Sequence, residues 1–182
     1  MDCAFPAGDE SDCSNDEWDI GYSSTKKSSH NQDGDTAVPV AEDDVSRLKM
    51  AISKGDILAV EQLLDNGMDV ETRLGYEWTP LMCAVNVANY DLAKLLLDRG
   101  ASANFRKDQY TVLMAGCTAS ASEDKIVRCV ELLLSRNADP NMLDRSHMTC
   151  LMLAARDGYS NVINLLVSHK AEINAQNSNG YT

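Results

Sequence analysis

Three short stretches of this sequence begin alike: TPLM at Thr79–Met82, TVLM at Thr111–Met114 and TCLM at Thr149–Met152. Leucine pairs recur with a similar period, at Leu63-Leu64, Leu95-Leu96, Leu132-Leu133 and Leu165-Leu166. The interval from Thr111 to Thr149 is somewhat longer than the one before it, and Thr182 continues the series at the chain's end. A recurring unit of about 33 residues indicates a protein built from stacked structural repeats.

Each unit carries the signals of two short helices. Thr79 is a favourable N-cap residue, and Pro80 fits the first turn of a helix, where its missing N–H costs nothing. Apolar side chains then follow the spacing of a helix face, first at Leu81, Ala84 and Val85 and again at Leu92, Leu95 and Leu96. We therefore predict that each unit contains a pair of helices joined by a short turn.

The second helix of each unit is predicted to end where the chain turns into a hairpin. Gly67, Gly100 and Asn137 follow the leucine pairs and tolerate the left-handed conformation in which many helices end. Lys170 takes this place in the fourth unit, at a cost on the order of 1 kcal/mol for a residue with a Cβ. ADPN at Ala138–Asn141 and its counterparts then turn the chain into a finger-like hairpin.

The repeat length and the Thr-Pro-Leu opening resemble the ankyrin-repeat family over everything past residue 44. The resemblance implies an all-α solenoid of helix-turn-helix units with β-hairpin fingers. Met82, Met114 and Met152 stand where that family usually has a histidine. Because a methionine side chain can only pack, we interpret these three as buried helix residues and not as ligands.

The spacing of these signals divides the chain into six segments. They are a disordered acidic tail (1–44), ankyrin repeat 1 (45–75), repeat 2 (76–108), repeat 3 (109–146), repeat 4 (147–179) and the start of a fifth repeat (180–182). Repeat 1 lacks the Thr-Pro opening and carries Arg47, Lys49 and Lys54, which suits an N-terminal cap with a polar outer face. Because NGYT at Asn179–Thr182 begins another unit, we expect the chain to be a fragment of a longer protein.

Repeat 3 holds an insertion. The interval from Thr111 to Leu133 is longer than the corresponding interval from Thr79 to Leu96 in repeat 2. The extra residues lie within TASASEDK at Thr118–Lys125, and we expect them to lengthen the loop between the two helices. Such a loop is either simply solvated or forms a lip that contacts a partner.

The acidic tail differs from the repeats in composition. Residues 1–44 hold 12 acidic and 2 basic side chains, a net charge of −10, and few apolar ones. Because such a segment buries too little apolar surface to offset the entropy of ordering, we predict that it is disordered. Trp18, Ile20 and Tyr22 alternate with acidic residues and Gly21 in this tail. They belong either to a solvated tail or to a short docking motif that folds on a partner.

Composition excludes several classes of function. Residues 45–182 hold 16 acidic and 14 basic side chains, so direct binding of nucleic acid, which needs clustered Lys and Arg, is not expected. No apolar run approaches the roughly 20 residues of a membrane span, and no secretory signal pattern opens the chain. The 6 cysteines form no CxxC pair, which favours free thiols in a reducing, cytoplasmic compartment.

The sequence offers no catalytic, cofactor or metal site. His30, His147 and His169 are far apart in the sequence, and no phosphate-binding glycine loop occurs. Cys83 and Cys117 fall on core-facing helix turns, where thiols are inert. We therefore predict a binding protein and not an enzyme, since solenoids present extended concave surfaces.

We predict that the hairpin tips and the inner helices form a protein-binding face. Its candidate residues are Tyr76, Glu77, Trp78, Asn86, Asn89, Arg106, Lys107, Tyr110, Arg145, His147, Met148, Arg156 and Tyr159. Aromatic and arginine side chains are common anchors of protein interfaces. The alternative for Trp78 and Tyr110 is that they only seal adjacent hairpins.

Several stretches together resemble, more narrowly, a germ-cell family of proteins that combine ankyrin repeats, a sterile alpha motif and a leucine zipper. They include WDIGY at Trp18–Tyr22, CVELLLSRNADPN at Cys129–Asn141 and SEDKI at Ser122–Ile126. The resemblance implies a scaffold of germ-line granules (nuage) that holds piRNA-pathway proteins and supports transposon silencing, spermatogenesis and meiosis. It also implies a membrane anchor on the mitochondrial outer surface in the full-length protein. The alternative is a general cytosolic ankyrin adaptor, such as a signalling inhibitor or a ligase substrate receptor.

Overall fold

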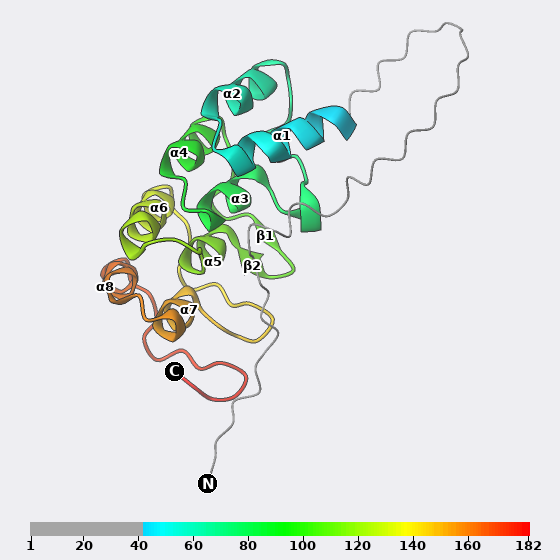
Figure 1. Ribbon diagram of the computed structural model, residues 1–182. Helices are drawn as coiled ribbons and strands as arrows, with labels where there is room; N and C mark the ends of the chain where they lie inside the picture. The colour runs from blue at the N-terminus through cyan, green and yellow to red at the C-terminus, as the bar shows by residue number, and fades with distance from the viewer. Residues whose placement is uncertain (1–41) are drawn as a thin grey trace, which may run out of the picture. The chain divides into compact units, whose positions relative to one another are not determined.

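The computed structural model of the chain describes residues 42–182, so the tail motif of Trp18, Ile20 and Tyr22 lies outside the described residues. The described helices form two adjacent columns (Figure 1). The inner helices are α1 (Glu42–Lys54), α3 (Pro80–Asn86), α5 (Val112–Cys117) and α7 (Cys150–Asp157). The outer helices are α2 (Ile57–Asp65), α4 (Tyr90–Asp98), α6 (Glu123–Ser135) and α8 (Ser160–Ser168). Each helix packs on its neighbours in its own column and on its partner in the other column, which confirms the predicted solenoid.

The recurring threonines start the inner helices α3, α5 and α7. Thr79, Thr111 and Thr149 have an extended backbone, and each buried hydroxyl oxygen accepts a hydrogen bond from the N–H three residues later. The nitrogen–oxygen distances are 3.3, 3.1 and 3.2 Å. These N–H groups belong to the recurring methionines, whose side chains are buried as predicted. An N-cap of this kind contributes about 1 kcal/mol to stability.

The predicted left-handed residues after the outer helices are also present. The φ angles are 96° at Gly67 and Gly100, 64° at Asn137 and 66° at Lys170. In each unit the next residue donates its N–H to a carbonyl in the last turn of the helix, at 3.0 to 3.2 Å. The reversed turn thus satisfies a carbonyl that the helix leaves without a partner, and Lys170 adopts it despite its Cβ.

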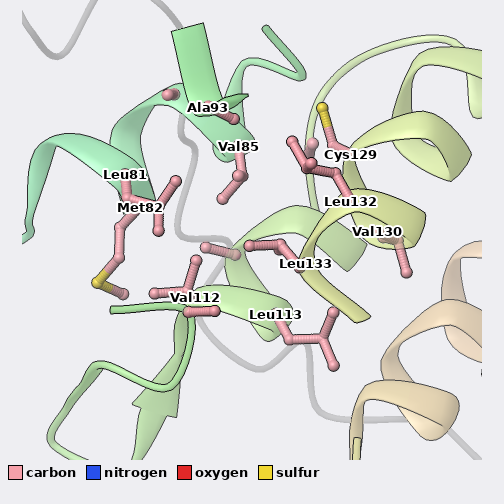
Figure 2. Close-up of a cluster of buried hydrophobic side chains, with 14 of the residues drawn as sticks. Leu81, Met82, Val85, Ala93, Val112, Leu113, Cys129, Val130, Leu132 and Leu133 are labelled. Atoms are coloured by element: carbon pink, nitrogen blue, oxygen red, sulfur yellow. The ribbon is translucent and has the colours of Figure 1, made fainter. Parts of the chain in front are cut away.

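The core is a continuous layer between the two columns, and Figure 2 shows its cluster in repeats 2 and 3. Leu81 and Val85 come from α3, Val112 from α5 and Leu133 from α6, and none of them is more than 1% exposed. Every residue of α3 and α5 is buried. Small side chains such as alanine, glycine and cysteine allow these two helices to approach their neighbours on all sides. Neither helix therefore presents an exposed side chain.

Side-chain amides join consecutive repeats. The amide of Asn104 donates to the carbonyl of Asn137 (2.8 Å), and its oxygen accepts from the N–H of Asp139 (2.9 Å). One repeat further on, Asn141 makes the same pair of bonds to backbone groups that follow α8, at 3.1 and 2.7 Å. Each bond links a repeat to its immediate neighbour, as the stacking of a solenoid requires.

Helix α1 begins earlier than expected. We placed residues 42–44 in the acidic tail, but the helix starts at Glu42. Acidic side chains favour the first turn of a helix because its N-terminus carries partial positive charge. Asp44 also lies 3.5 Å from the guanidinium of Arg47, one turn later. The acidic residues at this boundary therefore belong to the first turn of α1.

The insertion in repeat 3 lengthens a helix more than a loop, contrary to our expectation for Thr118–Lys125. Helix α6 begins at Glu123 and has 13 residues, whereas α4 and α8 have 9 each. Glu123 and Asp124 suit the first turn of a helix, and Ile126 falls on its buried face. Only residues 118–122 remain between α5 and α6.

Candidate protein-binding site

Four hairpin fingers project from the stack beside the inner helices (Figure 1). Finger 1 is residues 74–78 and contains the short 3-10 helix η2 (Gly75–Glu77). Finger 2 is residues 106–111 and contains the strands β1 (Arg106–Lys107) and β2 (Tyr110–Thr111). Finger 3 is residues 144–148, and finger 4 is residues 177–181. Strands β1 and β2 pair antiparallel, with Lys107 opposite Tyr110. In the other three fingers the first residue donates its N–H to the carbonyl of the last, at 2.8 to 3.0 Å. We call these four segments the finger row.

Bulky residues adopt the left-handed conformation at the finger tips. The φ angles are 57° at Tyr76, 59° at Glu77, 52° at Asp108, 72° at Gln109 and 58° at His147. A residue with a Cβ costs about 1 kcal/mol more than glycine in this conformation, yet all five residues are exposed and contribute little to the core. Asp108 and Gln109 are not predicted from the sequence, because an Asp-Gln pair does not signal a tight turn as Asn-Gly does.

Aromatic rings brace the bases of fingers 1 and 2. The rings of Trp78 and Tyr110 stack with their centroids 6.0 Å apart and 20° between their planes. Both residues are half-buried, and the hydroxyl oxygen of Tyr110 lies 2.7 Å from the hydroxyl oxygen of Thr118. This geometry favours the alternative in which the two rings seal adjacent fingers, and it leaves the tips for a partner.

A chain of ion pairs links the first three fingers. Glu77 of finger 1 pairs with the ammonium group of Lys107 in finger 2. The next residue, Asp108, lies 3.4 Å from Lys107 and 2.9 Å from the guanidinium of Arg145 in finger 3. The hydrogen bond to Glu77 raises the pKa of Lys107 above its usual value. The ion pairs therefore connect the three fingers to one another along the row.

Two residues of the predicted face serve the fold instead. Asn86 is only 9% exposed, as one of the buried residues of α3, so it does not line an open surface. The side-chain oxygen of Asn89 accepts a hydrogen bond from the N–H of Leu92 (3.1 Å) and caps α4. Polar residues at the end of a short helix are as often capping groups as surface groups, and sequence alone did not separate the two roles.

The remaining predicted residues lie toward the C-terminal repeats. In finger 3, His147 is exposed and Met148 is half-buried, and their side chains lie 3.4 and 3.3 Å from hydrogen-bonding partners in finger 4. Arg156 is exposed and donates to the carboxylate of Asp157 at 2.9 Å. Tyr159 is half-buried immediately before α8. Polar contacts therefore join fingers 3 and 4, as ion pairs join fingers 1 to 3.

Tyr76 and Arg106 are the predicted residues that remain most open to a partner. Tyr76 is 73% exposed at the tip of finger 1. Arg106 is exposed and, within residues 42–182, has no ion pair, unlike Lys107 and Arg145 in the same row. An exposed tyrosine and an arginine without a counterion are typical anchors of protein interfaces.

The thiols of the described repeats lie in the core. Cys83, Cys117, Cys129 and Cys150 are buried and are not joined in disulfides. Burial raises the pKa of Cys129 to about 11, and a hydrogen bond with Cys150 together with burial raises the pKa of Cys117. In the part of the chain that the structure describes, no group of three or more His, Cys, Asp or Glu side chains is placed to hold a metal ion. No helix there is long and apolar enough to cross a membrane.

The stacked helix pairs and projecting fingers define a class of repeat protein, and sequence comparison agrees with it. The family model "Ankyrin repeats (3 copies)" matches residues 48–144 and 117–182. The chain belongs to the ankyrin-repeat family, whose members are protein-interaction modules. The described part of the chain is thus a scaffold for protein interactions.

Curated relatives make the comparison more specific. They are named "Ankyrin repeat, SAM and basic leucine zipper domain-containing protein 1", and they confirm the narrower resemblance predicted from the sequence, to the proteins called GASZ. The relative from Notamacropus eugenii is 53% identical over 161 residues, which are 86% of this chain and 32% of the relative. Identity is 49% with the relative from Ornithorhynchus anatinus (91% of this chain, 34% of the relative) and 50% with that from Mus musculus (86% and 32%). The chain spans about a third of the length of these relatives.

Proposed function

We propose that this chain is the ankyrin segment of a non-enzymatic scaffold of germ-line granules. In this role it holds protein partners of the piRNA pathway and supports transposon silencing, spermatogenesis and meiosis. The support is the identity of about half of the aligned residues with the relatives above, over most of this chain. The proposed location is the cytoplasm, in germ granules, with the full-length protein at the mitochondrial outer surface.

The finger row is the part of the chain to which we assign partner binding. The observation that carries this assignment is the set of exposed side chains held at positive φ on its tips, where glycine would be less strained. The neighbouring helices α3 and α5 expose no side chain of their own. Ion pairs join the neighbouring side chains of the first three fingers, which lowers part of the entropy cost of ordering the row when a partner binds.

The test compares the partners that the gene's own full-length product retains in germ cells. Tagged wild-type protein is purified beside a double variant, Tyr76→Ala with Arg106→Glu, and beside Lys125→Glu. The last variant changes an exposed cation at the start of α6, outside the finger row. We expect piRNA-pathway proteins to copurify with wild type and with Lys125→Glu, and their recovery to fall by roughly tenfold with the double variant, as loss of an interface anchor does.

Two other outcomes would contradict parts of this proposal. Equal recovery of every partner by all three proteins would remove the finger row as the binding site. Partners drawn from signalling or ubiquitin-ligase complexes, with no piRNA-pathway protein among them, would replace the germ-line scaffold by the general adaptor.

A further inference from the structure

We propose that fingers 1 and 2 bind an acidic linear segment of a partner protein, with Arg106 as the charged anchor and Tyr76 as the aromatic anchor. This inference rests on the proposed function, because it specifies the chemistry of the partner that the finger row takes. It concerns the N-terminal half of the row, since the tips of fingers 3 and 4 hydrogen-bond to each other.

The carboxylates of fingers 1 to 3 are already engaged within the row. Glu77 pairs with Lys107, and Asp108 pairs with both Lys107 and Arg145. Asp144 accepts hydrogen bonds from two backbone N–H groups of its own finger, both at 2.8 Å. The acidic side chains of these fingers therefore have little remaining capacity for basic groups of a partner.

Two arginines at the bases of fingers 1 and 2, Arg73 and Arg106, make no ion pair in residues 42–182. Arg106 is exposed. Arg73, also exposed, lies with its guanidinium carbon 4.1 Å from the ring centroid of Phe105, the residue before Arg106. A guanidinium that stacks on a ring still offers its N–H groups to acceptors in its own plane. Two such groups attract carboxylates and match their geometry, so the complementary partner is acidic.

Tyr76 supplies the apolar contact of the proposed site. Its side chain is 73% exposed, and it belongs neither to the buried core nor to the apolar residues packed against the core. Its φ of 57° is strained for a bulky residue. Strain of this kind is concentrated at binding sites. A tyrosine ring gives a large contact area for little loss of side-chain entropy, which suits it to anchor a peptide.

The inner helices favour an extended segment over a bulky one. Helices α3 and α5, which lie beside fingers 1 and 2, are buried throughout and offer no side chains to grip a partner helix. The projecting side chains are confined to the short fingers. A linear segment that runs along fingers 1 and 2, from tip to base, can contact the aromatic anchor on one finger and the charged anchor on the next, as extended peptides do in other recognition modes.

The test is an unbiased peptide selection against the chain of 182 residues. A display library of random short peptides is selected on immobilised wild type, Arg106→Glu and the control Lys125→Glu. We expect wild type and Lys125→Glu to enrich peptides rich in Asp and Glu, and Arg106→Glu to lose that enrichment. The leading acidic peptide should bind about tenfold more weakly to Tyr76→Ala than to wild type and nearly normally to Tyr76→Phe. Unchanged melting temperatures exclude misfolding as the cause.

The alternative outcomes separate this inference from the proposed function. Enrichment of basic or uncharged peptides, or acidic enrichment that survives Arg106→Glu, would overturn the acidic segment as the ligand. Displacement of the acidic peptide by single-stranded poly-uridine RNA at equal concentration would assign the arginines to phosphate groups and also overturn it. If the selection enriches no acidic peptide while the recovery of germ-cell partners still depends on the finger row, the proposed function stands and the acidic segment is rejected as the ligand.

Discussion

Helix ends and finger tips use the same left-handed backbone conformation but different residues. In the described part of the chain, seven residues at helix ends have a positive φ, and four of them are glycine: Gly55, Gly67, Gly100 and Gly158. Six residues at finger tips have a positive φ, and only Gly180 of finger 4 is glycine. Glycine is therefore common where the turn has only a structural role, and it is rare on the fingers.

The comparison separates stability from binding within one molecule. At Gly67 and Gly100 an added Cβ would meet no atom within 4 Å, so backbone strain is what opposes a side chain at these helix ends. The finger tips have the same backbone strain, about 1 kcal/mol per residue, yet their residues are mostly not glycine. The helical columns, which hold the buried apolar surface, supply the free energy that offsets this strain.

The largest effect is expected from truncation of the core. Leu133 is fully buried in the cluster of Figure 2, and we expect Leu133→Ala to lower the free energy of unfolding by about 3 kcal/mol, through lost burial and a new cavity. Tyr76→Ala at a tip should change it by less than about 0.5 kcal/mol. Urea unfolding measures both variants. Comparable losses from the two would contradict the division between columns that stabilise and tips that bind.

The next largest loss of stability is expected from removal of a helix cap that the insertion of repeat 3 provides. Helix α8 follows Tyr159, which makes no capping bond. The carboxylate of Glu123, in the first turn of α6, instead accepts from the N–H of Asn161 at 2.6 Å. We expect Glu123→Ala to lower the free energy of unfolding by about 1–2 kcal/mol, because it leaves backbone donors at the start of α8 without a partner.

The matched control for the cap is Asp124→Ala. Asp124 is exposed in the same first turn of α6 and has no bond to α8 in the described structure. Urea unfolding of the two alanine variants should therefore differ by about 1 kcal/mol or more. If they lose the same amount, the effect belongs to the charge of the turn, and Glu123 does not act as a cap for the neighbouring repeat.

Local signals made most of the fold predictable. The threonine that caps an inner helix and the left-handed residue that ends an outer helix both act within a few residues of their own position. The sequence therefore indicated Thr79, Thr111 and Thr149 as caps, and it located even Lys170 correctly. The recurring period then fixed the order and pairing of the helices.

What the sequence did not show depends on contacts between repeats. The sequence predicts Glu123 as part of a loop, and its role as a cap depends on the contact with α8 of the next repeat. The surroundings that bury Asn86 also come from other elements. The tip of finger 2, Asp108 and Gln109, was missed because it connects two paired strands without the residues that usually form a tight turn, and the ion pairs of Asp108 reach other fingers.

Removal of strain at a helix end should stabilise the fold without any effect on binding. Lys170 has a φ of 66° after α8, and its carbonyl, which glycine retains, accepts from the side chain of Asn141. We expect Lys170→Gly to raise the free energy of unfolding by about 1 kcal/mol, partly offset by the greater flexibility of glycine in the unfolded chain. A rise of roughly 2–4 °C in melting temperature measures it. A fall would show that the lysine side chain stabilises the turn.

The same substitution on a finger tip should give a different pair of results. Gln109, with a φ of 72°, is exposed at the tip of finger 2. We expect Gln109→Gly to raise the melting temperature by about as much as Lys170→Gly, because it relieves similar strain. It should also weaken the selected acidic peptide several-fold, because glycine makes the finger that carries Arg106 more flexible, whereas Lys170→Gly leaves that affinity unchanged. Equal affinities for both glycine variants would mean that the finger tips are strained for a reason other than binding.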